Sequence, residues 1–416
     1  MQEEARRPRG LPALCENLTC RRHAILTAAL MMLQFRRITT QNRFIPQIDG
    51  LRFIAIASVV LFHVYAALQT RSAIPVPRPV NSDLAKRGVE LFFAISGFIL
   101  GVPFASTRLL NAPAIDLKKY FMRRVTRLEP PYIISLLGWL AAGLFIFHTP
   151  FAVMAPHFFA SCVYSQNLIF GAFVGAINPI AWSLEVEVQF YLLVPLLACL
   201  FSIADTRLRR ATILGLMLVS AVLSLPLYRT VHFHYSIAYY LAFFLAGFLV
   251  CDIYLKQSES RKSLLWDGLA LLAWPLVWYL GRDIGHVLLP FVIVLLYLAA
   301  FRGPICSTLL SHRAITNIGG MCYSIYLFHF LVIYCVKHIS YPLHIGKDFW
   351  LYYALQTCII TPFVLLFCGT FFVLIERPCM DREWPKKAWR YVRGVLGGNS
   401  RLAPEVKPEV GDTEAA

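Results

Sequence analysis

Two ionisable residues lie in a stretch that otherwise reads as the first half of a membrane span. Between Ile48 and Val64, the apolar run contains Arg52 and, eleven residues later, His63. On an α-helix both side chains lie on one face, about 16 Å apart along the axis. The arginine alone could extend to lipid headgroups, and the histidine alone could hydrogen-bond a neighbouring helix. Their shared face favours a functional path through the membrane.

Acidic residues accompany this pair. Asp49 is expected to cap the helix, because its carboxylate can accept the free amides of the first turn. Glu90 lies in the first turn of the next apolar run. There it either suits a helix N-terminus or reaches His63 and raises its basicity. Ser96 and Gly97 in the same run predict the close approach of another helix.

Three arginines, Arg123, Arg124 and Arg127, precede the third apolar run. On a helix their three- and four-residue spacings bring them toward one face. Guanidinium groups bind phosphate through two parallel hydrogen bonds, so the cluster predicts a site for an anionic ligand. The simpler alternative is ordinary anchoring of a span by basic residues on the cytoplasmic side.

The fourth apolar run opens with several polar residues. Trp182 is expected in the aromatic belt at the membrane surface, and Ser183 follows it. Glu185 and Gln189 share one helix face, whereas Glu187 lies nearly opposite. Carboxylates here are costly if they face lipid, so they are expected to face the interior of a helix bundle.

Two later runs contain further polar residues. Tyr323 and His329 lie within one of them, which places a second histidine in a span. Glu376 and Arg377 close the last run, directly before Pro378. This acid and base either belong to the same site or do no more than mark the end of the helix.

Membrane helices must position all of these residues. The chain has 416 residues, of which 58% are hydrophobic and 15% charged, whereas soluble domains carry about 25% charged residues. A bilayer core needs roughly 20 apolar residues per helix. We therefore predict an all-α, polytopic membrane helical bundle of about ten transmembrane helices. The expected spans are 51–69, 88–104, 131–148, 182–201, 211–228, 236–254, 264–280, 285–301, 317–337 and 350–375.

Basic residues predict the orientation of these spans. Lys and Arg accumulate in one set of connections, as expected for the cytoplasmic side. That set comprises the N-terminal tail and the segments 108–127, 207–210, 256–262, 302–313 and 377–393. Both termini are then cytoplasmic, in an inner or plasma membrane. The alternation holds only if the long segment 149–181 does not cross, so we expect it to be an outer loop, re-entrant or lying on the surface.

Composition also argues against other function classes. The net charge of +16 comes from residues between spans rather than from one basic patch with interleaved aromatics, so no nucleic-acid partner is predicted. The eleven cysteines are scattered and show no metal-ligand spacing, so no metal is predicted either. Residues 1–44 form a basic cytoplasmic arm, 45–380 the membrane domain, and 381–416 a cytoplasmic tail that is partly disordered.

These motifs, in this order, resemble the acyltransferase-3 family of membrane-embedded O-acyltransferases. The resemblance covers about residues 45 to 380. Its motifs correspond to Asp49–Arg52 with His63, Gly88–Phe98, Arg123–Pro130, Trp182–Tyr191 and Tyr323–His329. The resemblance makes Glu187, rather than Glu185, the family glutamate. The sequence departs from the pattern at Val188, where a second glutamate is usual, and at Phe328, where a tryptophan is usual.

The resemblance implies transfer of an acyl group, often acetyl from acetyl-CoA, to a hydroxyl of a sugar, glycolipid, envelope polysaccharide or macrolide. Acyl-CoA is then the donor co-substrate and a carbohydrate-type molecule the acceptor. The donor is cytosolic and carries several phosphate charges, so the three clustered arginines, together with Arg52, lie on the appropriate side to bind it.

His63 would deprotonate the acceptor hydroxyl as a general base or carry the acyl group transiently. Glu90 or Glu187 would orient it. The remaining polar residues are substrate-binding or structural candidates: Trp182, Ser183, Gln189, Tyr323, His329, Glu376 and Arg377. A multi-span transporter, or a permease that passes acyl groups to a partner enzyme, would also explain many spans with an interior His and Glu path.

Overall fold

The structure is a computed structural model that describes residues 44–69, 84–256, 262–281, 283–343 and 348–381, with a few residues near either end of the chain. All regular elements within these ranges are helices. Most of the expected N-terminal arm, 1–44, and of the expected tail, 381–416, lies outside the described residues.

Nine helices in the described ranges are long and apolar enough to cross a membrane, which confirms the predicted membrane bundle. They are α2 (Pro46–Gln69), α3 (Leu84–Leu109), α4 (Leu117–Phe145), α7 (Trp182–Leu197), α8 (Thr206–Ser224), α10 (Ile237–Lys256), α12 (Asp283–Arg302), α15 (Cys322–Ser340) and α16 (Phe349–Phe371). A turn of 3-10 helix extends α7 to Ser202, and a π-helical turn followed by α17 (Arg377–Cys379) extends α16. Pro378 therefore does not end the last helix at once.

The tenth expected span, 264–280, is the shorter helix α11 (Leu264–Tyr279). Its start lies beside the end of α12, because the Ser263 amide donates to the Arg302 carbonyl over 3.1 Å. Its last turn lies at the start of α3, where Arg87 donates to the Leu280 carbonyl. Helix α11 therefore runs antiparallel to α12 along the bundle. At 1.5 Å per residue its length is about 24 Å.

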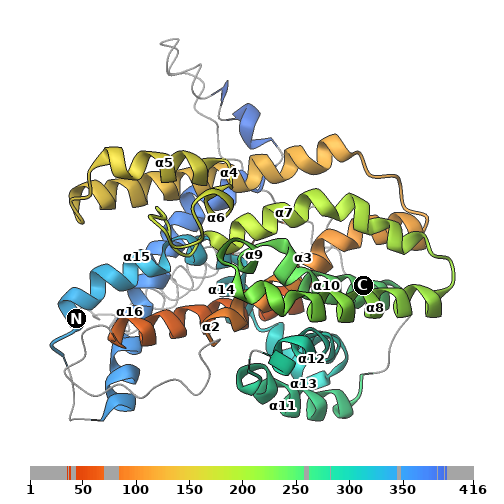
Figure 1. Ribbon diagram of the computed structural model, residues 1–416. Coiled ribbons are helices and arrows are strands. Elements are labelled where there is room, and N and C mark those ends of the chain that lie inside the picture. The colour runs from red at the N-terminus through yellow and green to blue at the C-terminus, as the bar shows by residue number, and fades with distance from the viewer. Residues whose placement is uncertain are drawn as a thin grey trace, which may run out of the picture.

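Small helices complete the fold. They are α5 (Phe151–Cys162), α6 (Gln166–Ile169), α9 (Val231–His234), α13 (Pro304–Leu310) and α14 (Arg313–Gly320). In Figure 1, α4 and α5 lie together along one side of the molecule, α11, α12 and α13 form a group on the opposite side, and α2 passes between them.

Two expected helix starts were wrong. Helix α2 begins at Pro46, whose fixed φ suits a first helical turn, so Asp49 lies inside the first turn rather than at the cap. Helix α4 begins at Leu117 after the Asp116 cap, well before the expected position 131, and continues through Pro130 and Pro131. Proline at position 130 leaves the Thr126 carbonyl without its helical donor. The indole of Trp384, at the far end of the chain, donates to that carbonyl over 2.8 Å.

The segment 149–181 folds back into the bundle. Helix α5 runs back along α4, because Met154 lies against Gly143 near the end of α4, whereas the Tyr132 hydroxyl donates to the Ser161 carbonyl. The following loop is packed against other helices, and its Asn178 amide donates to the Leu327 carbonyl of α15 over 3.3 Å. Non-helical backbone within a membrane bundle is tolerated where protein buries it. The packing of this segment is compatible with the re-entrant form of the expected loop, which stays a prediction.

Helices α3 and α10 cross closely at two glycines. A Cβ atom on Gly97 would lie 2.1 Å from the Phe244 carbonyl oxygen, and one on Gly247 would lie 2.1 Å from that of Ala94. This contact confirms the close approach that was predicted at Gly97.

We expect Gly97→Ala to lower the free energy of unfolding by about 1–3 kcal/mol, because the two backbones must separate to admit the methyl group. Thermal unfolding of the purified protein in detergent measures the change. Gly215→Ala on α8 is the matched control, since nothing lies within 4 Å of a Cβ there. Equal melting temperatures for the two variants would contradict the assigned crossing.

Candidate active site

The two histidines expected inside spans meet in the structure. His63 of α2 and His329 of α15 lie side by side, with 3.1 Å between His63 Nδ1 and His329 Nε2. Their ring centroids are 5.0 Å apart. His329 is fully buried and His63 is half-buried. The pair joins two segments that the sequence analysis had treated separately.

Backbone carbonyls around this pair indicate where the hydrogens lie. His329 Nδ1 is 2.8 Å from the Ile325 oxygen, and His63 Nδ1 is 2.9 Å from the Val59 oxygen. Carbonyl oxygens only accept, so in the neutral rings each Nδ1 carries the hydrogen. His63 Nε2 then keeps its lone pair, and no described residue hydrogen-bonds it. An imidazole in this state can act as a general base or as a nucleophile.

Aromatic and hydroxyl groups surround the pair. Phe330 packs edge-on against the His63 ring, with centroids 5.3 Å apart. One turn before His329, the Tyr326 hydroxyl lies 2.9 Å from Ser183 Oγ and donates to the Ile180 carbonyl. Ser183 of α7, a candidate from sequence, therefore contacts α15 one turn before His329.

Glu187 lies at the centre of a second polar group, nearer the start of α2. Ser96 Oγ donates to its carboxylate over 2.6 Å, and the Tyr191 hydroxyl also hydrogen-bonds it. The carboxylate interacts electrostatically with the Arg52 and Arg124 guanidinium groups. Helices α2, α3, α4 and α7 thus converge on this glutamate.

The expected arginine cluster lies along the first half of α4. The Arg124 guanidinium stacks on the Tyr120 ring at 3.7 Å from its centroid and donates to the Tyr120 carbonyl. Its Nε is buried without a hydrogen-bond acceptor. Arg127 has no hydrogen-bond partner among the described residues, and Arg123 is half-buried nearby on the same helix. Arg124 and Arg127 therefore retain donors that a ligand could use.

Asp49 holds Arg52 and Arg37 close together. Its Nη1 donates to Asp49 Oδ1 over 2.9 Å, and Arg37 Nη2 lies 3.5 Å from the same oxygen. Burial and then the nearby Arg52 charge lower the pKa of Arg37 to about 9, so it remains charged at neutral pH. The group therefore has two guanidinium charges against one carboxylate. Arg37 precedes the span and belongs to no motif, so the sequence alone does not mark it as a site residue.

Glu376 and Tyr323 fix the start of α15. The Ser324 amide donates to Glu376 Oε2 over 2.9 Å, and the Ser324 hydroxyl donates to the same oxygen. The Tyr323 hydroxyl donates to the Leu128 carbonyl of α4 over 3.0 Å. Glu376 also interacts electrostatically with Arg127. Arg377 is half-buried beside it. These contacts indicate that Glu376 and Tyr323 hold the helix that carries His329.

Glu90 lies in a different environment from the one expected. It forms a buried ion pair of 2.7 Å with Arg87, and its other oxygen lies 4.0 Å from His286 Nδ1. His286 in turn lies 3.0 Å from Ser224 Oγ. No hydrogen bond joins Glu90 to His63. The contacts of Glu90 link α3 to α12 and favour a structural role.

The remaining candidates of the fourth span contact segment 149–181 and residues in or beside α10. Glu185 accepts a hydrogen bond from the backbone N–H of Asn167 over 2.8 Å. Gln189 Oε1 accepts one from the Ile237 amide over 2.8 Å. Trp182 is buried against Tyr235. The expected place of Trp182 in the aromatic belt at the membrane surface stays a prediction, and its ring faces protein.

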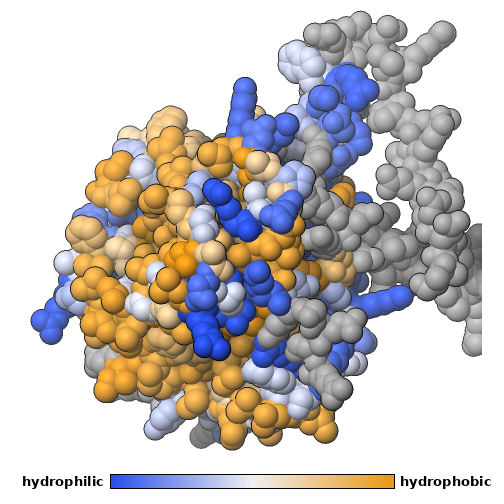
Figure 2. Space-filling model, turned by 90° about the vertical axis from the view of Figure 1, so that its right-hand side faces the viewer, coloured by the Kyte–Doolittle hydropathy of each residue, from blue (hydrophilic) through white to orange (hydrophobic). Residues whose placement is uncertain are grey.

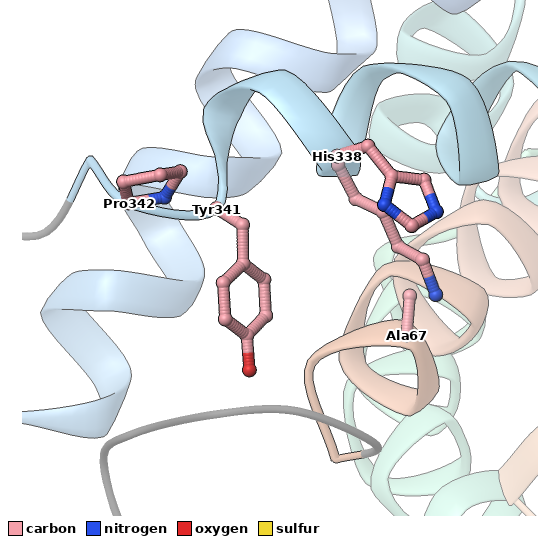
Figure 3. A pocket seen from close by; sticks show the side chains of 5 residues that line it. Ala67, His338, Tyr341 and Pro342 are labelled. Atoms are coloured by element: carbon pink, nitrogen blue, oxygen red, sulfur yellow. The ribbon is translucent and has the colours of Figure 1, made fainter.

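Two ends of the bundle differ in their surfaces. Figure 2 looks at the end where α3 connects to α4 and α7 to α8; hydrophilic side chains gather over its middle and hydrophobic ones surround them. Toward the opposite end, a cavity of about 160 Å³ lies between α2 and α15. Ala67, one turn beyond His63, lines it together with Lys337, His338, Tyr341 and Pro342. Figure 3 shows that the Tyr341 ring projects into the space beside Ala67.

Comparison with known proteins identifies the family to which this chain is similar. Residues 45–375 match the family model described as an acyltransferase domain of the acyltransferase-3 type. The O-acetyltransferase OatA of Staphylococcus aureus is 24% identical over 395 residues, which cover 85% of this chain and 61% of that protein. The peptidoglycan O-acetyltransferase OatA of Listeria monocytogenes is 29% identical over 210 residues, which cover 46% of this chain and 31% of that protein. The chain thus spans less than two thirds of these relatives. No solved structure matches it.

Proposed function

Because the chain belongs to the acyltransferase-3 family, we propose that it is a membrane-bound O-acyltransferase that moves an acyl group, in the simplest case acetyl, from acyl-CoA to a hydroxyl of a carbohydrate-type acceptor. The observation that carries the proposal is a histidine with a free ring nitrogen on the helix that also carries Arg52, one of several cations that α2, α4 and the residues before α2 bring together. His63 and Arg52 are separated by about 16 Å along α2.

The cationic group suits the phosphate end of acyl-CoA. Arg124 and Arg127 retain unused donors, and Arg37 adds charge beside Arg52. Guanidinium groups form bidentate, charge-assisted hydrogen bonds with phosphate. The long pantetheine arm would then extend along α2 toward His63. This orientation makes the arginine-rich end the cytoplasmic side, which is the side predicted from the distribution of Lys and Arg.

His63 would perform the chemistry at Nε2. In direct transfer, Nε2 takes the proton of the acceptor hydroxyl while the hydroxyl oxygen attacks the thioester carbonyl carbon. The carbon–sulfur bond then breaks, and the departing CoA thiolate takes the proton back from Nε2. In the covalent alternative, Nε2 itself attacks the carbonyl carbon, the carbon–sulfur bond breaks and the CoA thiolate leaves. The acceptor hydroxyl oxygen then attacks the same carbon, the carbon–nitrogen bond breaks, and the hydroxyl proton passes to the thiolate. The acceptor would enter from the end of α2 that carries the cavity beside Ala67.

The acceptor class is supported by the relatives, since one of them is named a peptidoglycan O-acetyltransferase. For this chain we propose the broader class of acceptor, a sugar hydroxyl at the outer face of an inner or plasma membrane.

Turnover of acetyl-CoA tests the proposal against a transporter or acyl-group permease. Purified protein in nanodiscs is mixed with acetyl-CoA and the disaccharide of N-acetylglucosamine, and free CoA and acetylated sugar are measured by mass spectrometry. Catalytic release of CoA above the rate in empty nanodiscs supports a transferase. Accumulation of acetylated protein without added sugar supports the covalent route. A protein that binds acetyl-CoA but never releases CoA contradicts the proposal.

We expect the double substitution Arg124→Ala with Arg127→Ala to weaken acetyl-CoA binding by about 10- to 100-fold, because each lost charge-assisted hydrogen bond is worth about 1.5–3 kcal/mol before compensation by its neighbours. Isothermal titration calorimetry in nanodiscs measures the dissociation constant. Arg207→Ala, an exposed arginine at the start of α8, serves as the matched control and should bind normally. Unchanged affinity in the double variant would remove these arginines from the donor site.

A further inference from the structure

We propose that His329 is a positioning residue that fixes the orientation of the His63 ring, so that Nε2 is presented as the reactive nitrogen. This inference rests on the proposed function, because it assigns how the catalytic histidine of that reaction is prepared. The two rings are joined by the 3.1 Å contact between His329 Nε2 and His63 Nδ1.

The direction of that contact follows from the surroundings of His329. Its Nδ1 faces two carbonyl oxygens, that of Ile325 at 2.8 Å and that of Tyr326 at 3.1 Å. Both can only accept, so Nδ1 carries the hydrogen and Nε2 of the neutral ring carries a lone pair. His329 Nε2 must therefore accept, and His63 Nδ1 must donate.

The contact with His329 constrains the His63 ring more than the hydrogen bond within α2 does. The Val59 carbonyl also accepts from His63 Nδ1, but it lies on the same helix and constrains one side of the ring only. His329 adds an acceptor from another helix and thereby fixes the plane of the His63 ring. Phe330 closes the remaining side with its edge-on contact. Together they leave Nε2 as the one nitrogen of His63 without a partner in the described part of the chain.

His329 is itself rigidly held, as a positioning group requires. It is fully buried, and successive turns of α15 before it are tied to the rest of the bundle. Ser324 is bound to Glu376, and Tyr326 contacts Ser183. When Nε2 of His63 takes up a proton during catalysis, the Nδ1 hydrogen still points at the His329 lone pair. That acceptor stabilises the imidazolium that forms, in the way that a third group behind a base does.

Two substitutions of similar size separate positioning from packing. His329→Gln supplies an amide oxygen that can accept from His63 Nδ1, whereas His329→Met fills similar space without a comparable acceptor. We expect His329→Met to lower kcat for acetyl-CoA turnover by about 100-fold, a typical size for loss of acid–base assistance. KM for acetyl-CoA should change less than about threefold, since His329 does not lie among the donor-binding arginines. The kcat of His329→Gln should be at least tenfold higher than that of His329→Met. Equal kcat values for the two variants would overturn the proposal.

The outcomes distinguish this inference from the proposed function. Absence of CoA release by the unaltered protein, or full activity of His63→Ala, would overturn the proposed function. Loss of activity in His63→Ala combined with full activity in His329→Met would overturn only the role of His329.

Discussion

His63→Ala is expected to lower acetyl-CoA turnover by about 10³-fold, within the range seen when a general acid–base group is removed. The substitution removes the only nitrogen at this position that can take the acceptor proton or carry the acyl group. Arg52 lies about 16 Å away along the same helix. Arg124 and Arg127 lie on α4, so acetyl-CoA should still bind. Turnover is measured as release of CoA, binding by calorimetry and folding by size exclusion, all on the same preparation.

His312→Ala is the control for this experiment. His312 is exposed at the start of α14 and should be dispensable for turnover. If His63→Ala folds, binds donor and keeps normal turnover, the histidine is a packing residue. The mechanism would then have to be rebuilt around Glu187, whose carboxylate meets Ser96 and Tyr191.

Asp252→Ala is expected to cause the largest loss of stability, about 3–5 kcal/mol, because it leaves a buried charge without its partner. Asp252 of α10 accepts from Arg209 Nε with one oxygen and from Arg210 Nε with the other, the latter over 2.6 Å. Asp252 and Arg209 are both fully buried. The three residues join α8 to α10 at the arginine-rich end of the bundle.

Thermal unfolding in detergent would measure this loss. Asp205→Ala is a matched control, since Asp205 only caps α8 by accepting from the Leu208 amide; its loss should cost about 1 kcal/mol. Asp252→Asn keeps acceptor capacity but removes the charge, so it should fall between the two. A melting temperature of Asp252→Ala at or above that of Asp205→Ala would show that the arginines find other partners.

Much of the bundle could be predicted from sequence because each span has its own apolar run. The shared face of Arg52 and His63 also follows from helix geometry alone. The pairing of His63 with His329 does not, since the two residues are 266 positions apart and meet only at a particular rotation and depth of two helices. Helix periodicity contains no information on either quantity.

Two other differences between the sequence-based predictions and the structure have identifiable causes. The ion pair of Glu90 with Arg87 was visible as a three-residue spacing on one helix, and that local signal should have outweighed a distant histidine. The start of α4 could not be found locally. Its two prolines indicate a break, and the compensating donor is Trp384, 258 residues after the carbonyl that it satisfies. A helix that depends on such a partner is continuous only in the folded protein.

The segment 149–181 also imposes an order on folding during synthesis. The Asn178 amide is satisfied by the Leu327 carbonyl, a residue that the ribosome adds 149 positions later, and the Trp139 indole donates to the same carbonyl. Until α15 has emerged and entered the membrane, these buried polar groups have no such acceptor and must remain hydrated. The segment can therefore adopt its final place only late in biogenesis, after most of the bundle has been inserted. A nascent chain arrested before α15 should expose 164–181 to proteases that the complete protein resists.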